Sequence, residues 1–259
     1  MKSPTLFTVL YEDDFIIAVN KASGVSVGGD RWDESKDRLD RLLTGRNGRR
    51  VFTVHRIDRD TSGLVVFARD EETHRKLSAA FERREVKKRY IAVIHGRPLW
   101  TETVCDLPLV PNGDKRHRTI IDKYRGKPSL TGFRFLGGAG NYSVLEARPE
   151  TGRTHQIRVH LSSLGHPLVC DPLYGGSRET DRAEGIFLSA FKRGWRGDPL
   201  EEKPLLSRLG LHAAGLTLPG FGTAEAFTLS APLPRDMAAL IGQMEKSAGA
   251  DFGIRPSPK

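Results

Sequence analysis

The chain has 259 residues, which suits one large domain or two small ones, and 38% of them are hydrophobic, enough for a packed core. It carries 41 Lys and Arg residues against 32 Asp and Glu, a net charge of +9 at pH 7. This surplus favours an anionic partner, of which nucleic acid is the commonest. Charge alone leaves open a basic protein without such a partner.

The remaining composition argues against a secreted or membrane protein. Cys105 and Cys170 are too few for a disulfide framework and lack metal-type spacing, which favours a reducing compartment. The apolar residues 6–10 are interrupted by acidic residues 12–14, too early for a signal peptide. No run approaches the ~18–20 apolar residues that span a bilayer. We expect a cytoplasmic protein without a membrane segment.

Helices are predicted at three places. Residues 34–43 carry leucines on one face, and Gly45 is the expected stop. Asp70 is the expected N-cap of a helix that reaches residue 84. Thr154 is the expected cap of a third helix, which ends at Gly165.

Strands are predicted between these helices, and they follow one another in hairpin-like succession. Residues 105–136 are interpreted as hairpin excursions, and residues 177–209 as a polar insertion. The fold class is therefore α+β, with mixed, mainly antiparallel sheets flanked by helices and loops. The expected strands cover residues 15–20, 53–58, 64–68, 90–95, 142–147, 211–218 and 224–229.

Two dense polar patches are the candidate functional features. The first, residues 55–63, stands directly before the apolar run 64–68; the second covers residues 151–158. Charged residues beside a buried strand need a partner or a function. Together the two patches suggest an active site.

Several kinds of site were weighed for the first patch. The scattered histidines, His155 and His160 among them, do not have the spacing of a zinc protease. In an extended segment Asp58 and Asp60 would lie roughly 7 Å apart, within the ~6.5–9.5 Å window of an inverting glycosidase, but Asp60 is better interpreted as a turn residue. Ser62 lacks the sequence around a nucleophilic serine. Asp58, expected to end a strand with an arginine beside it, is either a functional carboxylate or part of a buried salt bridge.

These residues resemble the motifs of the RluA-type pseudouridine synthases, which isomerise uridine in RNA. The resemblance extends in order from about residue 9 to residue 235, and Ala22 stands where the family usually has proline. The matching segments are H-R-I-D-R-D-T-S-G at 55–63, V-N-K-A-S-G-V at 19–25, K-R-Y-I-A at 88–92, T-G-R-T-H-Q-I-R-V-H-L at 151–161, G-H-P-L at 165–168, D-P-L-Y-G at 171–175 and L-H-A at 211–213.

The resemblance implies a pseudouridine synthase fold and a role for each matching residue. Asp58 would be the catalytic carboxylate, and Arg158 would keep it ionised by pairing with it. Tyr90 would pack on the target base and accept a proton. The reaction needs no cofactor or metal. The target uridine must leave its stem, and the expected RNA contacts are His55, Arg56, Thr61, Lys88, Arg153 and His155.

The resemblance also sets expectations for organisation and partners. We expect a single catalytic domain over residues 1–245, without an N-terminal S4-type domain, and a flexible tail over residues 246–259. The expected partner is ribosomal or transfer RNA, and the expected state is a monomer. Two alternatives are an RNA-binding or RNA-chaperone protein with a vestigial site, and a glycosidase that uses Asp58 and Asp60.

Overall fold

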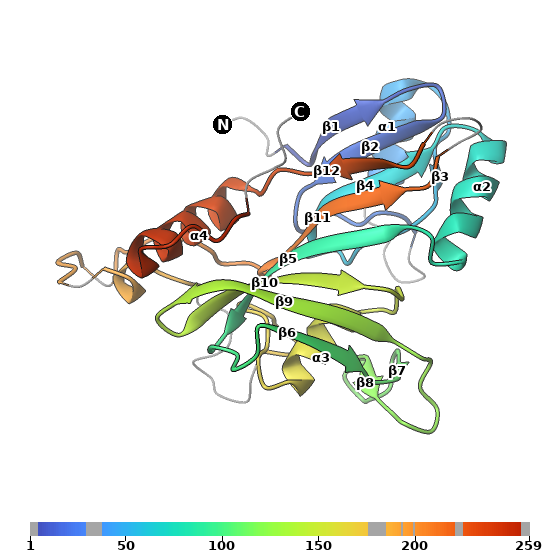
Figure 1. Ribbon diagram of the computed structural model, residues 1–259. Helices are drawn as coiled ribbons and strands as arrows, with labels where there is room; N and C mark the ends of the chain where they lie inside the picture. The colour runs from blue at the N-terminus through green and yellow to red at the C-terminus, as the bar shows by residue number, and fades with distance from the viewer. Residues whose placement is uncertain are drawn as a thin grey trace. The chain divides into compact units, whose positions relative to one another are not determined.

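The structure is a computed structural model that describes residues 5–29, 38–175, 185–192, 194–198, 200–220 and 225–254. The chain divides into two compact units, one formed by residues 1–89 and 212–232 and the other by residues 90–211 and 233–259. Each unit has strands arranged in a sheet (Figure 1). Each unit also has its own hydrophobic core. The α+β class with mainly antiparallel sheets is confirmed.

The sheet of the first unit is built around a fully buried strand. β4 (Ser62–Ala68) is apolar along most of its length, and it pairs antiparallel with β2 (Ile16–Lys21). Its side chains pack on both faces of the sheet, as a continuous apolar run requires. Further strands extend this sheet: β1 (Phe7–Glu12) pairs with β2, β11 (Leu211–Leu218) runs parallel to β4, and β12 (Phe227–Ser230) pairs with β11.

Two helices pack on the sheet of the first unit. In α2 (Glu71–Glu82), Asp70 accepts a hydrogen bond from the Thr73 amide at 2.8 Å, which confirms the predicted cap. α1 is Leu39–Asn47, later than predicted, and residues 30–37 lie outside the described residues. The predicted stop at Gly45 was wrong, because the left-handed residue that ends the helix is Gly48, with φ +63°.

The predicted strand 53–58 was also wrong. The short strand β3 (Phe52–Thr53), which includes only Thr53 of the predicted stretch, pairs with β4. The chain then leaves the sheet. The reason is a side chain: the Val66 amide of β4 donates to the Nε2 atom of His55 at 3.0 Å, not to a carbonyl. Asp58 therefore lies on an irregular loop and not at the end of a strand.

The second unit has a four-stranded antiparallel sheet. β5 (Lys87–His95), β10 (Tyr142–Pro149), β9 (Leu130–Ala139) and β6 (Glu102–Asp106) lie side by side in that order (Figure 1). The predicted excursion contains β6 and a separate short hairpin of β7 (Leu109–Val110) and β8 (Ile120–Ile121).

Two helices belong to the second unit. α3 (Gln156–Ser163) packs Ile157 and Leu161 into the core. Its N-cap is His155, not Thr154 as predicted. α4 (Arg235–Ala248) packs against β9, and the sequence analysis did not predict it.

The expected flexible tail from residue 246 was wrong as far as residue 254. α4 continues to Ala248, and Phe252 is only 5% exposed. Residues 255–259 lie outside the described residues, as do residues 177–184, 193 and 199 of the insertion 177–209. The described part of the insertion contains a short 3-10 turn at Leu188–Ala190. The expectation of a single catalytic domain over residues 1–245 stays a prediction.

Candidate active site

Asp58 lies on the loop between β3 and β4, where the chain makes a tight turn. The Thr61 amide donates to the Asp58 carbonyl at 3.1 Å, which closes a four-residue turn. Asp60 lies inside this turn, as predicted, but the turn is held by main-chain atoms. Asp58 itself is partly exposed. Its carboxylate is therefore carried on a short, constrained segment that a substrate could reach.

The segment that follows β2 holds this turn from the protein side. Lys21, 1% exposed, donates from Nζ to the Arg59 carbonyl at 2.8 Å. The Ser23 hydroxyl donates to the Asp60 carbonyl at 2.7 Å, and the Gly24 amide donates to the Arg59 carbonyl at 2.9 Å. These bonds bind the 21–24 segment to the two residues that follow Asp58. The sequence analysis gave Lys21 and Ser23 no role, although both lie in a quoted motif.

Contacts between the matched motifs at 55–63 and 211–213 fix the start of β4 to β11. The Ser62 hydroxyl lies 3.0 Å from Nδ1 of His212, and both side chains are buried. Gly63 has φ +118°, and a Cβ there would lie 2.3 Å from the Ala213 carbonyl oxygen. Only glycine fits this contact. Ser62 and Gly63 therefore connect β4 to β11, and they fix the C-terminal end of the loop that carries Asp58.

His55 is engaged within the protein. Besides accepting from the Val66 amide, its ring stacks on Phe81 with centroids 4.6 Å apart. Burial, with a smaller contribution from the charge of Lys88, lowers the pKa of His55 to about 3. The ring is neutral at pH 7, so it offers RNA phosphates no charge. These contacts indicate a structural role, and the RNA contact expected of His55 stays a prediction.

Three other predicted RNA contacts also lie in the first unit. Arg56 is exposed and Lys88 partly exposed. Thr61 is 1% exposed, and its hydroxyl has no hydrogen-bond partner among the residues that the structure describes. A buried hydroxyl without a partner is costly, and such groups are enriched where function demands them.

The second polar patch forms the N-terminal end of α3. The Gln156 side chain organises it: its Oε1 accepts from the Thr151 hydroxyl at 2.7 Å and from the Arg153 amide at 3.0 Å. Arg153 also donates from Nε to the Pro128 carbonyl at 3.3 Å. His155 has φ +53°, and its Nδ1 lies 2.9 Å from the Tyr174 hydroxyl. Arg153 and His155 are partly exposed, as a phosphate contact requires.

Arg158 is held by a carboxylate that the sequence analysis did not assign. Its Nε and Nη2 atoms each donate to Asp171 at 2.8 Å, and the two side chains are 3% and 0% exposed. Asp171 also accepts from the amides of Leu173 and Tyr174. The sequence pointed to Asp171 only through the matched motif at 171–175, which begins with this residue. The pairing of Arg158 with Asp58 implied by the resemblance stays a prediction.

The predicted site residues are therefore distributed over both units. Asp58 and the predicted RNA contacts His55, Arg56, Thr61 and Lys88 belong to the first unit. Arg153, His155 and Arg158 belong to the second unit. Tyr90 is partly buried in β5 and packs on the core of the second unit. In the described part of the chain, no three His, Cys, Asp or Glu side chains gather as metal ligands. None of the described helices has the length and hydrophobicity needed to cross a membrane.

Comparison with known proteins defines the class. Residues 15–163 match the family model described as RNA pseudouridylate synthase. The ribosomal large subunit pseudouridine synthase D of Zymomonas mobilis is 33% identical over 90% of this chain and 71% of its own length. The dual-specificity RNA pseudouridine synthase RluA of Escherichia coli K12 is also 33% identical, over 85% of this chain and 90% of its own length.

The fold agrees with the sequence. The structure titled Human RNA Pseudouridylate Synthase Domain Containing 1 has a TM-score of 0.68 and 26% identity, and covers 90% of this chain and 87% of its own. The chain belongs to the RNA pseudouridylate synthase family. It is an RNA pseudouridine synthase, an isomerase that acts on uridine in RNA. The resemblance found in its motifs is confirmed, and the glycosidase alternative is discarded.

Proposed function

We propose that this enzyme isomerises uridines in structured ribosomal RNA, with transfer RNA as a second candidate substrate, and that Asp58 is the catalytic carboxylate. The name of one relative, a ribosomal large subunit pseudouridine synthase, supports ribosomal RNA, and the dual specificity in the name of another supports more than one target. Transfer RNA is the second class that the resemblance of the motifs implies. The observation that supports the role of Asp58 is its turn: the buried Lys21 and the partly buried Ser23 hold this turn by hydrogen bonds, and the Asp58 carboxylate on it is partly exposed.

The chemistry needs a carboxylate that is ionised and fixed in place. The C1′–N1 bond of the uridine breaks, the uracil rotates, and C5 bonds to C1′; N1 gains a proton and C5 loses one. A carboxylate can act as nucleophile or as base in such a sequence. Neither role needs a cofactor. For Tyr90 and Arg158 we keep the roles that the resemblance implies, proton acceptance and support of the Asp58 charge.

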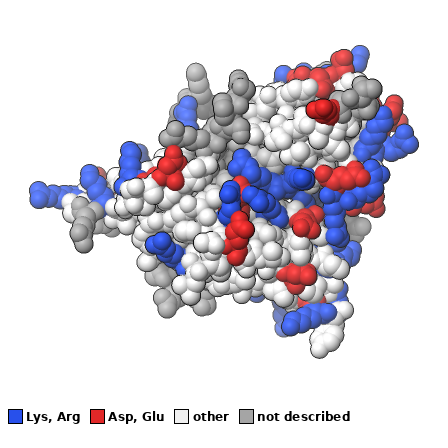
Figure 2. Space-filling model, in the orientation of Figure 1, with Lys and Arg blue, Asp and Glu red and all other residues white. Residues whose placement is uncertain are grey.

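Binding of the RNA would use the positive surplus of the chain. Lys and Arg side chains gather in several groups on one face, with acidic side chains between them (Figure 2). Arg56 is proposed to fill the position that the flipped base leaves, because guanidinium both stacks and bonds phosphate. We propose Thr61, Lys88, Arg153 and His155 as further contacts. The enzyme would act in the cytoplasm as a monomer.

The test is Asp58→Asn, with Asp60→Asn in the same turn as the matched control. The substrates are unmodified ribosomal and transfer RNA transcripts carrying 5-tritiated uridine, because bond formation at C5 releases the label. We expect Asp58→Asn to lower the rate roughly 10³-fold or more with RNA affinity within a few-fold, and Asp60→Asn to remain active. Equal activity of Asp58→Asn and the parent would refute the assignment.

A further inference from the structure

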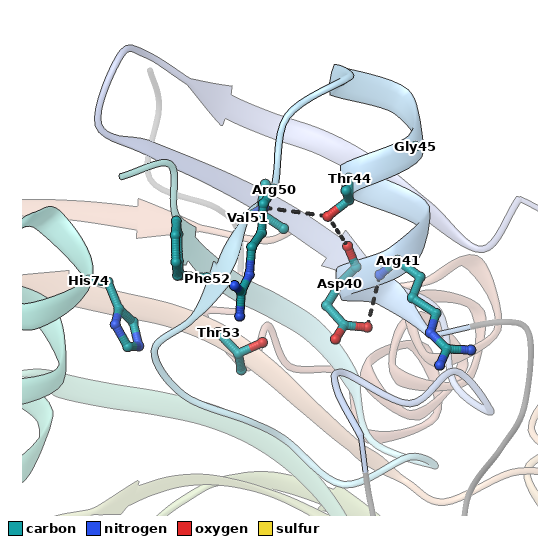
Figure 3. Close-up of a pocket in the computed structure, with 9 residues that line it drawn as sticks. All are labelled: Asp40, Arg41, Thr44, Gly45, Arg50, Val51, Phe52, Thr53 and His74. Atoms are coloured by element: carbon teal, nitrogen blue, oxygen red, sulfur yellow. Dashed lines mark hydrogen bonds between the residues drawn. The ribbon is translucent and has the colours of Figure 1, made fainter. Parts of the chain in front are cut away.

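A second feature of the first unit is a pocket of about 600 Å³ beside β3, which does not include Asp58 among its lining residues (Figure 3). α1 forms one wall, the 50–53 segment forms the floor, and α2 contributes His74. The lining residues are Asp40, Arg41, Thr44, Gly45, Arg50, Val51, Phe52, Thr53 and His74. The hydroxyl of Thr44 joins two of these parts: it donates to the Asp40 carbonyl at 2.8 Å and accepts from the Val51 amide at 3.4 Å.

The pocket has an uncompensated positive charge. Among the described residues that line it, the one carboxylate is that of Asp40, which is paired with Arg38, whose Nη2 lies 2.6 Å from Oδ2. Arg41 and Arg50 are exposed, and neither forms an ion pair with any residue that the structure describes. The whole segment 38–53 contains five arginines and one aspartate. Such a surface favours an anion.

The pocket also offers planar groups. The Arg50 guanidinium lies over the Phe52 ring, 5.0 Å from its centroid, and the His74 ring lies 5.5 Å from Phe52 at 31°. In Figure 3 the Arg50 side chain runs alongside the Phe52 ring, and His74 lies on the other side of this ring. Aromatic rings and arginine planes are the groups on which unpaired RNA bases stack.

The chain keeps this pocket within reach of the catalytic turn. Thr53 and Asp58 are five residues apart, so their Cα atoms are separated by at most about 18 Å. An RNA strand that presents a uridine to Asp58 can therefore extend to the pocket. A ligand that occupied it would be bound by charge and stacking together.

We propose that this pocket binds an unpaired nucleotide that flanks the target uridine in the same RNA. The Arg50 guanidinium, backed by Phe52, stacks on the base, and Arg41 bonds to the phosphate. The inference rests on the proposed function, because it assigns a further part of the same substrate to a site outside the turn at Asp58.

The test compares three variants with the parent protein: Arg50→Ala, Arg41→Ala and Arg50→Lys. Arg97→Ala is the matched control, because Arg97 is also exposed over a phenylalanine ring, 5.8 Å from the centroid of Phe135. Binding of a fluorescent oligouridine of about ten nucleotides is measured as a function of salt concentration. Tritium release from the ribosomal and transfer RNA transcripts is measured on the same samples.

We expect Arg50→Ala and Arg41→Ala each to weaken binding at 200 mM salt about threefold or more and to reduce the salt slope by about 1. Arg50→Lys should keep the slope but lose affinity, because lysine retains the charge and not the plane. The inference is overturned if both alanine variants match Arg97→Ala in affinity and slope. If the parent releases no tritium from either RNA class, the proposed function fails instead, whatever the oligouridine results.

Discussion

Replacement of Lys21 by methionine tests whether the buried lysine positions the Asp58 turn. The Nζ atom donates to the carbonyls of Ala22 at 2.9 Å and Arg59 at 2.8 Å, and the side chain is 1% exposed. Methionine keeps most of the volume of the stem but donates no hydrogen bond. The variant removes the Nζ donor from both carbonyls, although the Arg59 carbonyl keeps the bond from the Gly24 amide.

The magnitude follows from these bonds. A hydrogen bond from a charged donor contributes about 1.5–3 kcal/mol, and the variant loses the two bonds that Nζ donates. Removal of the desolvated ammonium offsets part of this loss, because burying a charge is itself costly. We expect a net destabilisation of about 2–4 kcal/mol, or roughly 4–16 °C in Tm for a chain of this size.

The effect on catalysis should be larger than the effect on RNA binding. A displacement of about 1 Å in a reacting group costs about 10²-fold in rate, and the turn that loses Lys21 carries Asp58. Thermal unfolding and single-turnover tritium release are the assays. Lys76→Met is the control, because Lys76 forms only an exposed helical pair with Glu72. A Lys21→Met protein with the parent's Tm and rate would refute a positioning role.

Two further predictions concern the carboxylate of Asp171 and the ring of His55. Asp171→Ala removes the carboxylate that accepts two bonds from Arg158, and should destabilise the protein by about 3–5 kcal/mol in urea unfolding; a change below about 1 kcal/mol would contradict the importance of this buried pair. Burial lowers the pKa of His55 in the folded protein to about 3 from its ordinary value of 6.5, so the unfolded chain binds the proton first as the pH falls. The free energy of unfolding should therefore decrease between about pH 6.5 and 3, by up to ~1.4 kcal/mol per pH unit from this group. Glutamine keeps an acceptor but does not titrate, so His55→Gln should show a smaller decrease in the free energy of unfolding over this pH range, measured by urea unfolding at several pH values. Equal decreases in the parent and the variant would contradict the lowered pKa of His55.

Much of the fold was predictable because its signals are local. The strand β11 was predicted with its observed bounds, and α2 begins at the predicted cap, Asp70. The helix α4 had a local signal that the sequence analysis missed: Met237, Leu240, Ile241 and Met244 recur at helical spacing and are all buried. Polar and small residues at its end suggested a tail instead.

The sequence by itself determined the family, because ordered motifs of mixed polar residues are far more specific than composition or periodicity. It also singled out the segment that contains Asp58. Only the tertiary structure decided what the residues around it do. Lys21, His55 and Asp171 are all polar side chains whose bonds reach distant parts of the chain, to Arg59, Val66 and Arg158. Spacing along a sequence reports which face of an element a residue occupies, but not which buried donor or acceptor satisfies it.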